Sequence, residues 1–182
     1  DSIMANNWNL TKSDYANHKG AYSGSNERVK MDEVYVDATM PFWDNLKTSL
    51  SKTIKQYSDQ HKKFTSHHHT YFRINKYSTG GFMSEHSDNI HHSHGQQYGY
   101  PLVSVLFYLN DDYEGGVFSV AGKEFVTEKG SAIIFPSRIC LASSIPPNNG
   151  PIVPTNVVII CIITGLLRRI TFNDAHTRFL PE

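Results

Sequence analysis

The strongest constraint on the fold is a change of residue pattern near position 70. Before it, 41–64 has the spacing of an amphipathic helix, with Pro41 suited to the first turn. After it, short apolar segments alternate with turns rich in Gly, Asn and Asp. The expected strands are 31–38, 70–77, 103–109, 117–120, 123–127, 131–135 and 157–163. Many short strands separated by such turns are typical of a sandwich or barrel, so we expect a mainly β protein with flanking helices and a jelly-roll core.

The length of the chain fits one domain. A chain of 182 residues can bury a substantial core. We expect a single domain over 1–182, in which 1–69 form an N-terminal support with the helix at about 41–64. The jelly-roll core is then expected over 70–170.

Charge and hydropathy exclude several classes of protein. Seventeen basic residues balance seventeen acidic ones, so neither a nucleic-acid partner nor an anionic membrane is expected. The longest apolar run, 157–163, is far shorter than the roughly 20 residues of a membrane helix. Two cysteines, Cys140 and Cys161, make no disulfide framework, and no secretory signal pattern opens the chain. We therefore expect a cytoplasmic protein.

The chemistry is concentrated in the segment 77–88, which ends in the pattern His-x-Asp. Residues two apart on a strand point to the same face, so His86 and Asp88 can offer an imidazole and a carboxylate to one metal ion. Two histidines and one carboxylate that leave open positions are typical of non-haem Fe(II) oxygenases. Tyr77, nine residues before His86, is either a hydrogen-bond donor to a bound cosubstrate or a core tyrosine.

Two further groups of histidines have simpler interpretations. His91, His92 and His94 fall in a polar segment, 89–99, and we expect them on an exposed loop beside the site. The run 67–69 is expected at the junction of helix and strand, without a function. The serines have no visible general-base partner, so a hydrolase triad has no support.

Together, these motifs resemble the iron(II)/2-oxoglutarate-dependent dioxygenases, in particular the prolyl 4-hydroxylase-like branch. The resemblance lies in 71–77, 81–89, 101–116 and 130–137, in matching order and spacing. It implies a double-stranded β-helix core, with His86 and Asp88 as iron ligands and Tyr77 as a donor to 2-oxoglutarate.

The resemblance weakens after residue 137. The family pattern continues with a distal His and then a basic residue for the far carboxylate of 2-oxoglutarate. In this chain Ser143 takes the place of that His, and the basic residue would fall near Ile152 or Val153. Between 139 and 167 there is no charged residue and no aromatic one.

Three explanations of this difference stay open. The site is degenerate, or another group completes it, or the printed sequence is locally wrong. Candidates for completing it are His176 or a water as the third ligand, and Arg138 or Arg168 as the cation.

The activity implied by the resemblance is hydroxylation of an unactivated C–H bond, with a prolyl residue of a peptide or protein as the candidate substrate. The cofactors would be Fe(II) and the cosubstrate 2-oxoglutarate, with ascorbate as a further candidate and O2 as the oxidant. Two alternatives stay open. One is a catalytically degenerate jelly-roll binding module without the third iron ligand, and the other is a cupin-like metal protein of different chemistry.

Overall fold

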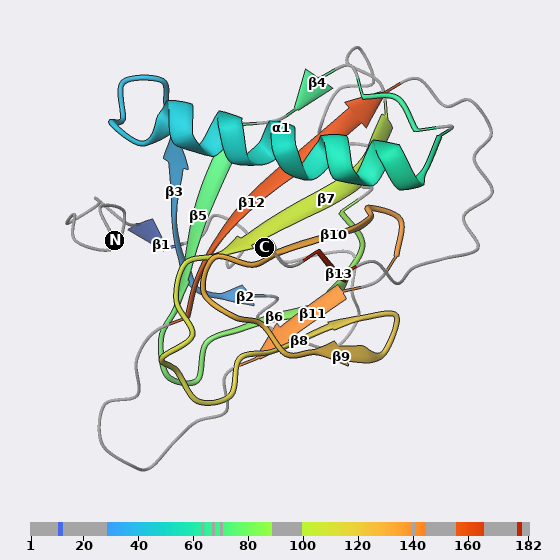
Figure 1. The fold of residues 1–182 in the computed structure, drawn as a ribbon. Helices are drawn as coiled ribbons and strands as arrows, with labels where there is room; N and C mark the ends of the chain where they lie inside the picture. The colour runs from blue at the N-terminus through green and yellow to red at the C-terminus, as the bar shows by residue number, and fades with distance from the viewer. Residues whose placement is uncertain are drawn as a thin grey trace.

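The protein is built in layers, with one helix above a large sheet and a smaller sheet below it (Figure 1). The computed structural model describes residues 11–12, 29–62, 64–66, 68–69, 71–88, 100–139, 141–144, 156–165 and 178–179. For 11–12, 100–101, 141–144, 156–165 and 178–179 it describes the backbone. No helix in this part of the chain is long and apolar enough to span a membrane.

In the described residues, eight strands form the large sheet. Their order is β1-β3-β5-β12-β7-β10-β13, and β4 also pairs with β12. All of these pairings are antiparallel. The bounds are β1 Thr11–Lys12, β3 Asp32–Val36, β4 His68–His69, β5 Phe72–Tyr77, β7 Tyr100–Tyr108, β10 Ala132–Pro136, β12 Asn156–Gly165 and β13 Arg178–Phe179.

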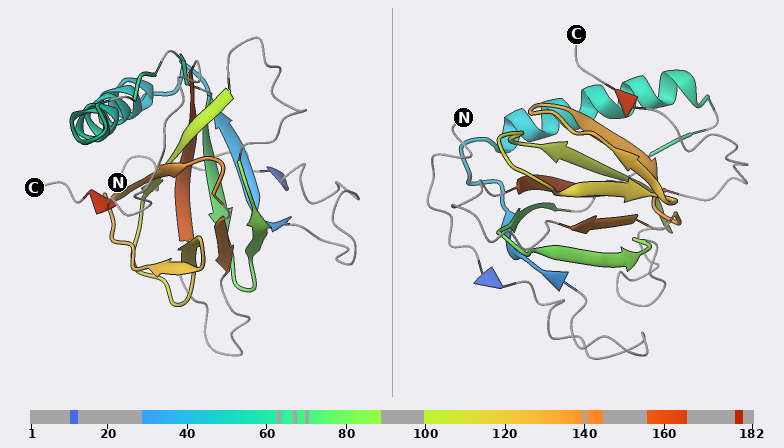
Figure 2. Two further views of the ribbon diagram at one scale, coloured as in Figure 1. Left: turned by 90° about the vertical axis from the view of Figure 1, so that its right-hand side faces the viewer. Right: turned by 90° about the horizontal axis from the view of Figure 1, so that it is seen from below.

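Five described strands form the smaller sheet, in the order β2-β6-β11-β8-β9, again antiparallel throughout. Two sheets whose neighbouring strands are often distant in sequence give a jelly roll. Figure 2 shows the two sheets from the side and from below. The bounds are β2 Val29–Lys30, β6 Phe82–His86, β8 Val117–Val120, β9 Lys123–Phe125 and β11 Leu141–Ser144.

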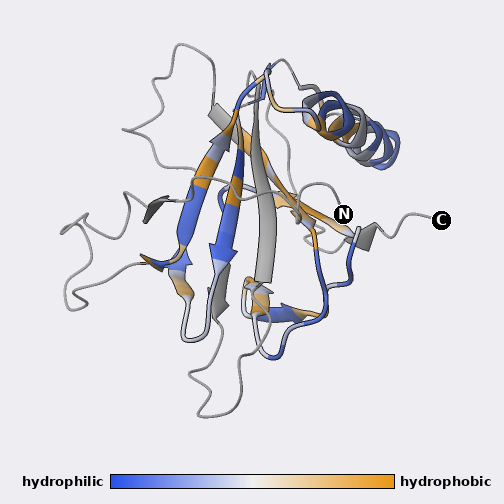
Figure 3. Cartoon of the chain, turned by 90° about the vertical axis from the view of Figure 1, so that its left-hand side faces the viewer, coloured by the Kyte–Doolittle hydropathy of each residue, from blue (hydrophilic) through white to orange (hydrophobic). Residues whose placement is uncertain are grey.

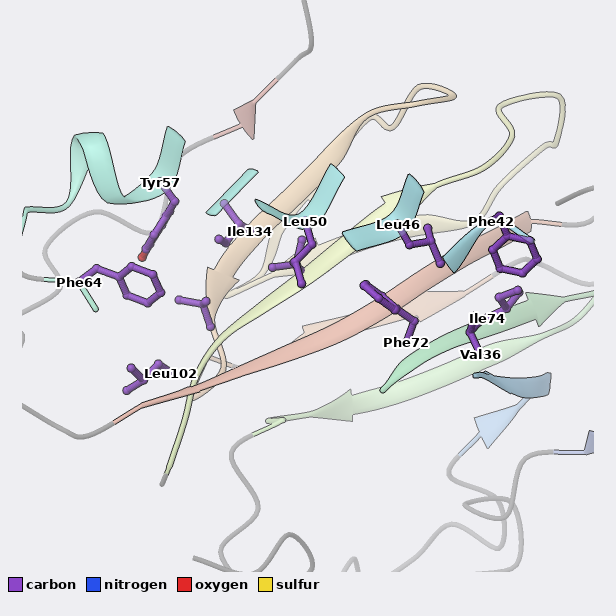
Figure 4. Close-up of a cluster of buried hydrophobic side chains, with 12 residues drawn as sticks. Val36, Phe42, Leu46, Leu50, Tyr57, Phe64, Phe72, Ile74, Leu102 and Ile134 are labelled. Atoms are coloured by element: carbon purple, nitrogen blue, oxygen red, sulfur yellow. The ribbon is translucent and has the colours of Figure 1, made fainter. Parts of the chain in front are cut away.

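The helix α1, Trp43–Gln60, covers the outer face of the large sheet. Its buried residues recur at helical spacing, and hydrophobic and hydrophilic residues alternate along it (Figure 3). Figure 4 shows how this buried stripe meets the apolar side chains of the sheet. The residues of this outer core that the figure labels are Val36, Phe42, Leu46, Leu50, Tyr57, Phe64, Phe72, Ile74, Leu102 and Ile134.

A second core fills the space between the two sheets. Strand alternation separates it from the outer core, because Phe72 and Ile74 of β5 belong to the outer core and Tyr77 to the inner one. The inner core consists of Val29, Met31, Tyr77, Met83, Leu106, Tyr108, Phe118, Val120, Ile133 and Phe135. Polar residues of β5 that lie two or four positions before Tyr77 therefore face the space between the two sheets.

The structure confirms the predicted fold class, a mainly β protein with a helix in front of a jelly roll. The helix ends at Gln60 rather than near residue 64, because the chain turns at His61 and brings Phe64 back onto Tyr57, with ring centroids 5.0 Å apart. The sequence pattern missed the short strand β11, which is paired on both sides by β6 and β8. The predicted division into support and core stays a prediction.

Candidate metal centre

A tight turn sets the start of β6 and with it the position of the His-x-Asp pair. The backbone N–H of Gly81 donates to the Ser78 carbonyl at 2.7 Å. A Cβ on Gly81 would lie 2.7 Å from that same oxygen and 3.0 Å from the carbonyl oxygen of Lys30, closer than real Cβ atoms come. Glycine is thus required for the close backbone approach that starts this strand.

His86 ends β6, and Asp88 follows it by two residues, as the sequence predicted. The Nε2 atom of His86 lies 3.2 Å from Oδ1 of Asp88, and both side chains are largely buried. The other ring nitrogen, Nδ1, lies 2.8 Å from the Ser84 carbonyl oxygen. That oxygen can only accept, so Nδ1 carries a proton.

This arrangement fits a metal ion on chemical grounds. When its proton is on Nδ1, a neutral His86 directs the lone pair of Nε2 toward Oδ1 of Asp88. Two hydrogen-bond acceptors 3.2 Å apart repel each other unless a cation or a second proton lies between them. Metal-bound histidines commonly donate their other ring N–H to a carbonyl in this way. His86 and Asp88 therefore supply two donors suited to Fe(II).

Three serines hold Asp88 and its neighbour in place. The hydroxyl of Ser104, from β7, donates to Oδ2 of Asp88 at 2.5 Å and lies 3.0 Å from the hydroxyl of Ser137. Ser87 donates to the Ser137 carbonyl at 2.7 Å. Ser104 and Ser137 are fully buried. No sequence signal singled out these serines, because their contacts with 87–88 span 16 and 50 residues of chain.

Tyr77 lies in the inner core, with its hydroxyl 3.9 Å from the sulfur of Met83. Burial, the largest cause, raises the pKa of Tyr77 to about 12, against the opposing effects of the Arg73 charge and the Asn75 amide. The charge of Asp88 also acts on this hydroxyl and raises its pKa further. Tyr77 is therefore a hydrogen-bond donor at any physiological pH, and its role toward 2-oxoglutarate stays a prediction.

Beside Tyr77, β5 and β3 carry a buried polar group. The Nη1 atom of Arg73 lies 3.4 Å from Oε2 of Glu33, with 15% and 5% of the two side chains exposed. Asn75 is fully buried, and its amide acts on the hydroxyl of Tyr77, whose pKa it lowers. Alternation along the strand expected over 70–77 puts Arg73, Asn75 and Tyr77 on one face, but the sequence gives no reason to assign the first two a function.

The described residues supply no third ligand of the histidine, cysteine or carboxylate type beside His86 and Asp88. In that part of the chain no three His, Cys, Asp or Glu side chains gather closely enough to hold a metal ion. Across the sheet, the backbone register places Leu141 opposite His86, whereas Ser143 lies opposite Met83. The expected replacements His176 and Arg168, and the histidines at 91, 92 and 94, lie outside the described residues.

Of the other residues considered from the sequence, three lie at exposed positions in the described part of the chain. Arg138 is exposed, which does not favour it as the cation of a buried carboxylate site. His68 and His69 form the short exposed strand β4, paired with the end of β12. His67 lies outside the described residues.

Comparison with known proteins agrees with this architecture. The family model described as the 2OG-Fe(II) oxygenase superfamily matches residues 72–151. No curated protein matches the chain significantly.

Three solved structures with a similar fold are prolyl hydroxylases. The enzyme of Pseudomonas putida has a TM-score of 0.61 at 12% identity, covering 86% of this chain and 77% of its own. The prolyl hydroxylase of Trichoplax adhaerens, in complex with a peptide fragment of the hypoxia inducible factor oxygen degradation domain, has a TM-score of 0.60 at 14% identity, covering 85% and 70%. The viral collagen prolyl hydroxylase of Paramecium bursaria chlorella virus 1, in its 2OG complex, has a TM-score of 0.58 at 13% identity, covering 76% and 81%.

The matched family implies Fe(II) and 2-oxoglutarate as cofactors. The resemblance predicted from the sequence is thus confirmed: residues 72–151 match the 2OG-Fe(II) oxygenase superfamily, and the fold is the jelly roll of the prolyl hydroxylases.

Proposed function

We propose that this protein is an Fe(II)- and 2-oxoglutarate-dependent dioxygenase that hydroxylates an unactivated C–H bond. The observation that carries the proposal is the His86–Asp88 pair, in which Nε2 and Oδ1 face each other at 3.2 Å while Nδ1 donates to Ser84. The match of 72–151 to the oxygenase family supports the same function.

The roles of the residues follow from their contacts. His86 and Asp88 would hold the metal, and Ser104 would keep the carboxylate of Asp88 turned toward it by donating to Oδ2. Tyr77, protonated at physiological pH, would donate a hydrogen bond to 2-oxoglutarate. When bound, the iron and 2-oxoglutarate supply the oxidation, in which O2 is consumed, succinate and CO2 are formed and the substrate gains a hydroxyl group.

For the substrate, we propose a prolyl residue in a peptide or protein. Support comes from the shared fold with prolyl hydroxylases, one of which was solved with a bound peptide fragment. This support is an analogy of fold.

The competing candidate is a jelly-roll binding module that binds a ligand at this site but does not catalyse a reaction. It is favoured by two observations: the register partner of His86 is Leu141, which cannot ligate a metal, and no three His, Cys, Asp or Glu side chains of the described residues gather closely enough to hold a metal ion. The two candidates differ in whether 2-oxoglutarate is converted to succinate.

The test is an anaerobic titration of the protein with Fe(II) and 2-oxoglutarate, followed by the visible absorption band of the chelate and then by succinate formation in air. We expect a band and turnover in the wild type, and loss of both in Asp88→Ala. Glu85→Ala is the matched control, because Glu85 lies on the same strand but is exposed. Binding without succinate would establish the binding module, and an unchanged band in Asp88→Ala would overturn the assignment of the metal site.

A further inference from the structure

We propose that Ser137 is a positioning residue of the metal site, which acts on Asp88 through the hydroxyl of Ser104. This inference rests on the proposed function, because the site that Ser137 supports is the proposed metal site. Ser137 lies one hydrogen bond further from the carboxylate than Ser104 does.

Two neighbouring strands of the large sheet bring the two hydroxyls together. Ser104 lies two residues before Leu106 on β7, and Ser137 lies two residues after Phe135 of β10. Leu106 and Phe135 belong to the inner core, so alternation directs both serine side chains into the space between the sheets. The backbone N–H of Ser137 continues the pairing of the two strands by donating to the Leu102 carbonyl at 3.0 Å. The two hydroxyl oxygens lie 3.0 Å apart.

The proton of each hydroxyl has only one consistent direction. An ionised carboxylate accepts hydrogen bonds and donates none, so Ser104 gives its single proton to Oδ2 of Asp88, at 2.5 Å. The hydroxyl of Ser104 then has no proton left for Ser137, and Ser137 must be the donor in the 3.0 Å contact. Both protons therefore point the same way, from Ser137 to Ser104 and from Ser104 to Asp88. In such a chain each hydrogen bond polarises and strengthens the next.

Ser137 is well placed to fix this direction. Its carbonyl accepts a hydrogen bond from the Ser87 hydroxyl at 2.7 Å, so its backbone is tied to the residue beside Asp88 as well as to β7. The side chains of Ser104 and Ser137 are fully buried, so bulk solvent does not compete for either hydroxyl. Without the donor at 137, the oxygen of Ser104 is left unsatisfied and its proton is less firmly committed to Asp88.

The chain of hydroxyls ends on the oxygen of Asp88 that does not face His86. Oδ2 accepts from Ser104, whereas Oδ1 lies 3.2 Å from Nε2 of His86. Hydrogen bonds to a ligating carboxylate fix its orientation. Ser137 therefore helps to keep Oδ1 turned toward the metal position, although it is two hydrogen bonds away from that oxygen's carboxylate.

The test is a double-mutant cycle on metal affinity, measured by calorimetry of the full-length protein with Mn(II) alone. We expect Ser137→Ala to weaken Mn(II) binding by about 3–10-fold, the range of one neutral hydrogen bond. In a Ser104→Ala background the same substitution should change the affinity by less than about twofold, because the hydroxyl through which it acts is gone. A merely structural effect of Ser137→Ala would be the same in both backgrounds.

A matched control separates the role of Ser137 from the loss of any buried serine. Ser131 is likewise buried next to β10, but its hydroxyl donates to the Glu128 carbonyl in a turn. Ser131→Ala should therefore leave the Mn(II) affinity unchanged. Urea unfolding establishes that each variant is folded under the conditions of the titration.

The outcomes separate the two proposals. If Asp88→Ala abolishes Mn(II) binding but Ser137→Ala behaves like Ser131→Ala, or weakens binding equally in both backgrounds, the role of Ser137 is wrong while the proposed metal site stands. If the folded wild type does not bind Mn(II), or if Asp88→Ala binds it as the wild type does, both proposals are wrong.

Discussion

The two oxygens of the Asp88 carboxylate have different neighbours. Oδ1 faces Nε2 of His86, and Oδ2 accepts a short hydrogen bond from Ser104. Hydrogen bonds to a ligating carboxylate fix its orientation. We therefore expect the hydroxyl of Ser104 to contribute to metal binding at the proposed site, although it is not itself a ligand.

We predict that Ser104→Ala weakens metal binding. Loss of an outer partner typically costs about 10–100-fold in metal affinity, and we expect a change of that size for Fe(II) or Mn(II) by calorimetry, with the fold intact. Ser131→Ala is the matched control, because Ser131 is equally buried but donates to the Glu128 carbonyl in a turn. Equal metal affinity in the two variants would contradict the positioning role of Ser104.

The sequence predicted that His86 and Asp88 lie close together, and the structure shows them 3.2 Å apart, while their role as metal ligands stays a prediction. This proximity was predictable because residues two apart on a strand point to the same face. Ser104 and Ser137 could not be predicted, because their contacts depend on which strands of the two sheets come together. Alternation along the expected strand 70–77 puts Arg73 and Asn75 on the face of Tyr77, but their burial beside Glu33 follows from the pairing of β3 with β5.

Helix α1 and the longer strands were predictable because each has a regular period. Leu46, Leu50 and Tyr57 recur at helical spacing and are buried, as the pattern requires. The strand β11 has no such signal. Its residues, Leu-Ala-Ser-Ser, carry little β-propensity, and the strand forms because β6 and β8 pair with it on either side.

We predict that Leu50→Ala destabilises the protein by about 2–5 kcal/mol, the usual cost of a cavity at a buried leucine. The affinity of the folded protein for metal should not change, because α1 packs on the face of the large sheet away from the inner core. Urea unfolding and metal calorimetry measure the two effects. Lys47→Ala, at an exposed position of the same helix, should change neither quantity.

Across the whole molecule, both cores contain buried tyrosines. Burial raises the pKa of Tyr57 and of Tyr77 to about 12 and raises that of Tyr108 well above its ordinary value. Their hydroxyls lose protons near pH 10 in the unfolded chain but resist ionisation in the folded one. The stability that follows from this difference is fully present below about pH 10 and is lost as pH rises through the folded pKa.

We predict that the contribution of these tyrosines to the free energy of unfolding is constant up to about pH 10 and then falls toward pH 12. Each such tyrosine contributes a slope of about 1.4 kcal/mol per pH unit. Urea unfolding at a series of pH values measures it. Tyr57→Phe should reduce the slope, whereas Tyr35→Phe should leave it unchanged because Tyr35 is 54% exposed. Equal slopes in the two variants would show that burial of Tyr57 is not the cause.

The hydrogen bonds of Ser87 and Asp88 also have a consequence for how the protein opens. Both residues follow β6 of the smaller sheet, and their partners, Ser137 and Ser104, belong to the chain segments of the larger sheet. The two layers are thus joined at the end where the metal pair lies. Local opening of the jelly roll should therefore start at other edges, so that amide hydrogen exchange around His86 approaches the rate set by global unfolding.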